Sequence, residues 1–194
     1  MGLHKVKKGL DLPISGAPNQ SIEDAPAPNA VAIMAADFHG MKPKMEVQVG
    51  DAVKRGQILF EDRNNPGVFF SSLAAGNVTA VNRGAKRALQ SVVVELNANE
   101  KSGNLTEDDY QSFESYGAVK GKAPNPLEAD SIKALLIESG LWTTIRVRPF
   151  SRVPAPDSAP NSIFVTATDS EPLTADVDAV LEGKLADFER GLGI

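Results

Sequence analysis

The chain has 194 residues, of which 42% are hydrophobic and 23% charged, and its net charge is −5. This composition fits a soluble globular protein of one sizeable or two small domains, and its acidic balance argues against a nucleic-acid partner. The absence of cysteine excludes disulfides, thiolate metal sites, Cys-ligated iron–sulfur clusters and a Cys nucleophile, and the two separated histidines form no metal-binding spacing.

Residues 1–29 are expected to form an extended N-terminal segment. Proline at positions 13, 18, 26 and 28 argues against a regular helix. The early lysines are followed by no apolar stretch of the kind that a secretory signal needs. No apolar run in the sequence approaches the roughly 20 residues that span a bilayer. We therefore expect a cytoplasmic chain that reaches a membrane only through a partner.

Residues 30–100 are predicted to form a β domain. Short apolar runs near 47–49, 58–60, 68–70 and 91–97 are separated by glycine- and proline-rich breaks, which is typical of a small sandwich or barrel. The segment 64–67, Asn-Asn-Pro-Gly, is a strong turn signal.

The pattern V-x-x-G-D-x-V-x-x-G-Q-x-L-F-E, followed by A-x-G-x-V, resembles the biotinyl/lipoyl-type barrel-sandwich hybrid. Carrier proteins of that fold hold a modified lysine at a hairpin tip, and the corresponding turn here, residues 61–67, has no lysine. The resemblance therefore implies a structural or docking domain and not a swinging arm. Lys86 and Arg87 lie in a later turn, which is either a solvated basic turn or a contact for an acidic partner protein.

Residues 101–125 are expected to be a linker. Aromatic residues at Tyr110, Phe113 and Tyr116 suggest that it packs on another part of the protein. A helix is predicted over 126–139, because the preceding segment forms a capping box and apolar residues follow at helical spacing. Gly140 suits the position just after the helix.

Residues 126–194 are predicted to be the start of an incomplete Rossmann-like α/β domain, so the fold class is α+β or α/β. A buried strand is expected over 162–168 and a helix over about 175–190. Asp169 and Glu171 follow the strand, where ligands bind in open α/β sheets; the alternative is that they cap a helix and complement its dipole.

A second resemblance covers nearly the whole chain. The segments K-V-K-K-G-L-D-L-P-I-S-G-A-P-N-Q at 5–20, H-G-M-K-P-K-M at 39–45, E-S-G-L-W-T at 138–143 and R-V-R-P-F-S at 146–151 occur in order. They resemble the A subunits of the Na+-translocating NADH:quinone oxidoreductases.

This resemblance implies a peripheral subunit on the cytoplasmic face of the bacterial inner membrane. Such a protein supports electron transfer from NADH to ubiquinone coupled to Na+ export. The implied partners are the other subunits, especially the membrane-embedded ones, which hold the flavins and the iron–sulfur cluster. We expect no catalytic, cofactor-binding or metal-binding residue in this chain; direct contact with ubiquinone is left open.

Distant relatives of these A subunits hold FMN with a glycine-rich loop after the helix equivalent to 126–139. Here that loop retains Gly140 alone and contains the bulky Trp142, so FMN binding of that type is not expected. Arg146 and Arg148 remain as residues that bind an anion or contact another protein of the complex. The alternative to the whole interpretation is a stand-alone barrel-sandwich binding or scaffold module without a redox role.

Overall fold

A computed structural model describes residues 5, 9, 14–122, 129–167, 169 and 171–193. The described chain divides into two compact units. The barrel unit comprises residues 26–160, and the terminal unit comprises the described residues within 1–25 and 161–192. Each unit is considered by itself.

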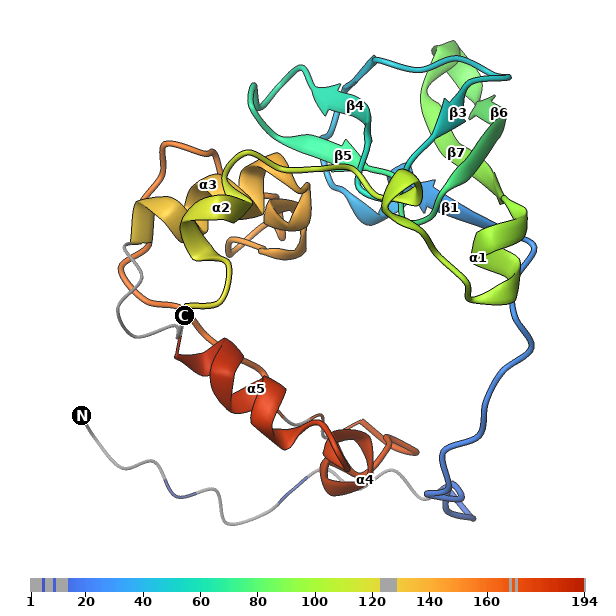
Figure 1. Cartoon of the computed structure of the whole chain (residues 1–194). Helices are drawn as coiled ribbons and strands as arrows, with labels where there is room; N and C mark the ends of the chain where they lie inside the picture. The colour runs from blue at the N-terminus through green and yellow to red at the C-terminus, as the bar shows by residue number, and fades with distance from the viewer. Residues whose placement is uncertain are drawn as a thin grey trace. The chain divides into compact units, whose positions relative to one another are not determined.

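Two antiparallel sheets form the centre of the barrel unit (Figure 1). The four-stranded sheet has the order β1-β7-β6-β3 and the three-stranded sheet the order β2-β4-β5. The strands are β1 (Ala30–Met34), β2 (Pro43–Met45), β3 (Ala52–Val53), β4 (Ile58–Asp62), β5 (Phe69–Ser71), β6 (Gly76–Arg83) and β7 (Leu89–Leu96). The predicted β domain with strands at 58–60, 68–70 and 91–97 is confirmed, whereas residues 47–49 form no strand and lead into the Gly50 turn.

The core lies between the two sheets because alternate residues of each strand face inward. Phe60 and Phe70 stack with their ring centroids 4.6 Å apart, and both are buried. Val78, Val92 and Val94 of β6 and β7 complete the cluster from the other sheet. Gly67 has φ +85°, so the predicted turn before β5 uses the left-handed conformation that glycine permits.

The segment predicted as a linker packs on the barrel. The helix α1 (Ala98–Ser102) leads into it, and a 3-10 turn at Glu107–Asp109 and α2 (Tyr116–Val119) follow. Arg55 and Tyr110 form a parallel bridge, in which the Arg55 N–H donates to Asp109 and the Gln111 N–H donates to Arg55. The expectation that this segment is not free in solution is confirmed.

The helix predicted over 126–139 is present as α3 (Ala129–Glu138). The capping residues proposed for its start lie outside the described residues. Gly140 follows with φ +80°, as expected for a residue that ends a helix, and a 3-10 turn at Leu141–Thr144 continues the chain.

Two expectations for the terminal unit are wrong. Residues 162–167 form no strand, and Ile163 and Phe164 are 79% and 91% exposed, because no described strand lies beside them to complete a ladder. The helix expected over 175–190 is two helices, α4 (Val177–Leu181) and α5 (Leu185–Leu192). Gly183 adopts φ +71° between them, which interrupts the helical hydrogen bonding.

Candidate functional site

The barrel unit has a groove with a volume of about 1290 Å³. Five cationic side chains line it, and no aspartate or glutamate does. These cations are Lys42, Arg63, Arg83, Lys86 and Arg87. We call this feature the basic groove.

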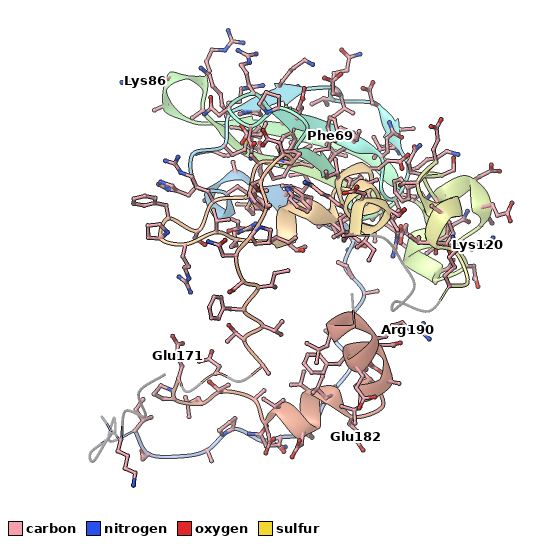
Figure 2. The ribbon with its side chains drawn as sticks, turned by 90° about the vertical axis from the view of Figure 1, so that its left-hand side faces the viewer. Phe69, Lys86, Lys120, Glu171, Glu182 and Arg190 are labelled. Atoms are coloured by element: carbon pink, nitrogen blue, oxygen red, sulfur yellow. The ribbon has the colours of Figure 1, made fainter. Side chains whose placement is uncertain are left out.

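The β6–β7 hairpin forms one wall of the basic groove. The Gly84 N–H donates to the Ala88 carbonyl over 2.8 Å and closes the hairpin, whose tip is a 3-10 turn at Ala85–Arg87. Lys86 and Arg87 both adopt positive φ, 53° and 60°. Figure 2 shows Lys86 at the tip of this hairpin, at the edge of the ribbon.

Strand pairing forms the opposite wall. β2 is antiparallel to β4 with Pro43 opposite Asp62, so the residues just beyond that pair, Lys42 and Arg63, become neighbours. The Arg63 N–H donates to the Lys42 carbonyl over 2.8 Å. The Asp62 carboxylate accepts hydrogen bonds from the backbone N–H groups of Lys42 and Asn64, at 2.9 and 3.0 Å, and so is turned toward the backbone.

Apolar side chains lie between the two walls. Met34, Phe38, Met41, Met45 and Leu89 belong to the lining. The Phe38 ring meets Phe70 edge-on, with centroids 4.7 Å apart, which joins the groove to the core. Met34, at the end of the edge strand β1, is 46% exposed. The basic groove therefore offers contacts for apolar side chains as well as for anions.

Arg146, which was predicted from the sequence to contact an anion or a partner protein, lies beside the basic groove. Its guanidinium carbon is 4.8 Å from the centroid of Phe38, a cation–π contact, and it donates to the Thr143 carbonyl. Arg148 is exposed in the turn that precedes Arg152. Of the two arginines singled out in the sequence, the structure connects Arg146 to the groove through Phe38.

The loop after α3 is part of the protein's packing. Trp142 is buried, and its indole N–H donates to the Pro154 carbonyl over 2.9 Å. A Cβ at Gly140 would lie 2.4 Å from Ser71 Oγ, so strand β5 fills the space beside this glycine. These contacts give the loop a role in the packing of the barrel unit.

The turn corresponding to a carrier's lysine turn is held by its own contacts. Glu61 accepts a hydrogen bond from the Gly67 N–H over 2.9 Å and pairs with Lys44 at 3.2 Å. The Gly67 N–H and the Lys44 ammonium keep the pKa of Glu61 below its ordinary value. Both Glu61 and Lys44 thus stabilise the hairpin.

The other acidic residues singled out in the sequence form no crevice. Asp169 accepts a hydrogen bond from the Glu171 N–H over 3.0 Å in an exposed turn, and the strand expected before them is absent from the described segment 162–167. Within the described residues, no group of three or more His, Asp or Glu side chains is placed to hold a metal ion. No helix in the described part of the chain is long and apolar enough to cross a membrane.

The sequence carries little sign of the basic groove. Lys86 and Arg87 are recognisable as a basic turn, but Lys42, Arg63 and Arg83 are scattered over more than forty positions. Pairing of β2 with β4 brings Lys42 and Arg63 together, and Arg83 lines the same groove from the other sheet. Placing the lysines and arginines of the sequence on a known barrel-sandwich structure would have shown that they are neighbours.

Two family comparisons cover most of the chain. The family of NqrA N-terminal barrel-sandwich hybrid domains matches residues 4–97, and the family of NqrA second alpha/beta domains matches residues 127–194. The expected order, a barrel-sandwich hybrid followed by an α/β domain, is confirmed.

Individual relatives agree. The proteins from Saccharophagus degradans and Pseudomonas aeruginosa are each 48% identical, over 191 and 190 residues, or 98% of this chain. The protein from Haemophilus influenzae is 48% identical over 189 residues, or 97% of this chain. Each of the three is the A subunit of a Na(+)-translocating NADH-quinone reductase. The chain spans about 40% of the length of these curated relatives. With both of its domains matched in order, the chain belongs to the NqrA family, the A subunits of the Na(+)-translocating NADH-quinone reductases.

Proposed function

We propose that this chain acts as a peripheral subunit of a Na+-translocating NADH:quinone reductase. In this role it supports electron transfer from NADH to ubiquinone coupled to Na+ export, at the cytoplasmic face of the inner membrane. The observation that carries the proposal is the 48% identity to an NqrA protein over 98% of the chain.

The proposal assigns no catalytic residue to this chain. Trp142 has a structural contact that accounts for it, and the turn at residues 61–67 is held by the Glu61–Lys44 pair. Electron carriers belong to the other subunits in this proposal, and the chain contributes binding surfaces. The basic groove is the surface best suited to that task, because it combines apolar lining with five cations.

A stand-alone barrel-sandwich module is the second candidate. Its support is the barrel unit, whose two sheets and Phe60–Phe70 core are internally complete. A module of that kind has no need of residues 127–194, which match the second domain of the NqrA family. We therefore favour the role in the reductase.

The test is Na+-stimulated NADH:quinone reduction in membranes from cells that lack the gene. We expect the activity to be lost and to return when the full-length gene is supplied. A matched control supplies the gene with an early stop codon, which should restore nothing. Unchanged activity in the deletion strain would refute the role in the reductase and favour the scaffold module.

A further inference from the structure

The basic groove concentrates positive charge on a protein whose net charge is −5. Among the described residues, the ion pairs of the barrel unit join Lys44, Arg55 and Lys101 to glutamates, and none includes a cation of the groove. We propose that the basic groove binds an extended acidic segment of another protein chain. The proposal rests on the proposed function in one respect, which is that the partner is another protein of the same complex.

The charge of the groove selects an anionic partner. Its five lysine and arginine side chains have no acidic neighbour in the lining, and Arg146 adds a sixth cation beside Phe38. Three carboxylates adjoin lining residues in sequence. Asp62 accepts two backbone hydrogen bonds, Glu46 pairs with Lys44, and Asp37, in the 3-10 turn Ala35–Asp37, is not part of the lining. Uncompensated charges of one sign steer an oppositely charged partner and set its orientation.

The shape and lining of the groove favour a chain segment over a flat lipid surface. Met34, Phe38 and Met45 line the groove together with residues of the β6–β7 hairpin, so its apolar contacts come from several separate strands and turns. An extended segment with acidic and apolar side chains on alternate positions would contact both the cations and these apolar groups.

Backbone groups at the groove also favour an extended protein segment as the ligand. β1 and β2 are each the outermost strand of their sheet, and both reach the groove through Met34, Pro43 and Met45. An outermost strand has unpaired N–H and C=O groups along one edge, to which an extended segment can hydrogen-bond. A small inorganic anion would use neither this edge nor the apolar lining.

A binding assay with a defined probe tests the proposal. The probe is a fluorescein-labelled peptide of twelve residues that alternates Glu and Val, and the readout is fluorescence anisotropy with the purified protein. A Lys/Val peptide of the same length is the control probe. We expect the Glu/Val peptide to bind, the Lys/Val peptide not to bind, and binding to weaken between 0.1 and 1 M salt, as the Debye length falls from about 10 to about 3 Å.

Two charge-reversed variants make the assay specific. The groove variant carries Arg63→Glu, Lys86→Glu and Arg87→Glu, all at exposed positions of the lining. The control variant carries Lys54→Glu, Lys120→Glu and Lys122→Glu, which are exposed positions outside the lining with the same change of net charge. Figure 2 shows Lys120 well away from Lys86 in the barrel unit.

We expect the groove variant to weaken binding of the Glu/Val peptide by at least about ten-fold, as several screened charge pairs become repulsive, and the control variant by under about two-fold. Equal weakening by both variants, or no binding of the peptide to the unaltered protein, would overturn the proposal. Circular dichroism shows whether each variant is folded. If the groove variant is unfolded, Lys86→Glu with Arg87→Glu, at the exposed hairpin tip, replaces it.

Sedimentation with phosphatidylglycerol vesicles tests whether the groove binds anionic lipid and not a protein segment. Vesicle binding that depends on the groove cations, without binding of the Glu/Val peptide, would assign the groove to anionic lipid and overturn the protein segment. Competition by 10 mM inorganic phosphate that abolishes peptide binding at constant ionic strength would instead indicate a small-anion site.

Photocrosslinking in the assembled complex distinguishes this proposal from the role in the reductase. A photoreactive residue at Gln90, which lines the groove, should crosslink to an acidic stretch of another protein of the complex. If gene deletion abolishes the reductase activity but the crosslink maps to lipid or to a non-acidic stretch, this inference fails alone. If deletion leaves the activity unchanged while the peptide assay succeeds, the role in the reductase fails alone.

Discussion

The Trp142 indole N–H donates a hydrogen bond of 2.9 Å to the carbonyl of Pro154. Trp142 is also part of the hydrophobic core that is otherwise formed by the two sheets. This one side chain therefore connects the loop after α3 to both the barrel and the segment that follows it. Its bulk has a structural use in the place where relatives with FMN are expected to need small residues.

Truncation of Trp142 should destabilise the barrel unit strongly. We expect Trp142→Ala to lower the free energy of unfolding by about 3–5 kcal/mol, because it removes a buried ring and leaves a cavity. Trp142→Phe keeps an aromatic ring but loses the hydrogen bond, and should cost about 1–2 kcal/mol. Because Trp142 is the chain's single tryptophan, urea unfolding is followed by circular dichroism and not by fluorescence.

The matched control is Leu141→Ala, at the neighbouring position, where the side chain is 54% exposed. Its cost should stay below about 0.5 kcal/mol. Equal effects at positions 141 and 142 would show that the loop is not anchored through the indole.

Gly140 should tolerate no side chain. Its φ of +80° disfavours any L residue, and a Cβ would lie 2.4 Å from Ser71 Oγ and 3.0 Å from Ser71 Cβ. We expect Gly140→Ala to lower the melting temperature by about 5 °C or more, since the strain and the contact together exceed about 1 kcal/mol. Gly117→Ala is the control, because Gly117 lies in α2 with no atom within 4 Å of the new Cβ and should be neutral or stabilising. Similar losses at both positions would contradict the close packing of Gly140 on β5.

The local signals in the sequence predicted much of the barrel unit. Glycines at breaks such as Gly50, Gly56 and Gly67 all adopt positive φ, so the turns followed from residue type alone. The runs that became β4 and β7 were long and apolar enough to be strands in any pairing. The helix α3 was equally local, because its apolar spacing and Gly140 identify it without tertiary contacts.

The errors in the prediction lie where strand pairing or a single glycine determines the secondary structure. Residues 162–167 have strand-forming side chains, but a strand needs a neighbour and no described strand provides one. Gly183 lies in a helical apolar pattern, yet its φ of +71° separates α4 from α5. Val47 and Val49 precede a turn in which the Gln48 N–H donates to the Asp51 carboxylate.

The basic groove could not be predicted from local sequence, because its residues are far apart in the chain. Lys42 and Arg63 lie twenty-one positions apart and meet because Pro43 pairs with Asp62 across β2 and β4. Lys86 and Arg87 reach the same space from another sheet. Arg146 comes from beyond the barrel strands and contacts the groove through a ring that the sequence did not mark.

The Arg55–Glu100 pair should be a stronger contact than an ordinary surface ion pair. Arg55 donates two hydrogen bonds to the Glu100 carboxylate, at 3.0 and 2.6 Å, and that carboxylate also accepts the Ala75 N–H at 2.7 Å. The Glu100 side chain is 3% exposed. We expect Arg55→Ala to cost about 1–2 kcal/mol in urea unfolding, because a nearly buried carboxylate loses its cation while Arg55 itself is partly solvated. Arg55→Lys should recover part of this, since it restores the charge without the two-pronged geometry.

The comparison for this prediction is Lys101→Ala, which breaks the exposed Lys101–Glu95 pair of 3.3 Å. Its cost should be about 0–0.5 kcal/mol. A Lys101 effect as large as that of Arg55 would mean that burial of Glu100 contributes nothing to the strength of its pair.

Asp109 should make the stability of the barrel unit depend on pH in the acid range. The Thr106 backbone N–H, followed by the side-chain amides of Asn97 and Asn99, donates to its carboxylate and holds its pKa well below the ordinary value of 3.8. A carboxylate whose pKa is lower in the folded state stabilises that state fully above the unfolded pKa, and the contribution is lost as the pH falls toward the folded pKa. The protein should therefore lose this contribution progressively below about pH 4.

Melting temperatures of the protein and of Asp109→Asn between pH 3 and pH 7 measure this effect. The variant should melt at a lower temperature by a constant amount from pH 5 to pH 7. The difference should shrink below pH 4, where Asp109 of the unfolded chain takes up a proton while the carboxylate of the folded protein stays ionised. Asp108→Asn, an exposed neighbour, should change the melting temperature little at any pH. If the difference in melting temperature between the protein and Asp109→Asn stays constant down to pH 3, the negative charge of Asp109 does not contribute. The hydrogen bonds around position 109 would then stabilise the fold through their geometry alone.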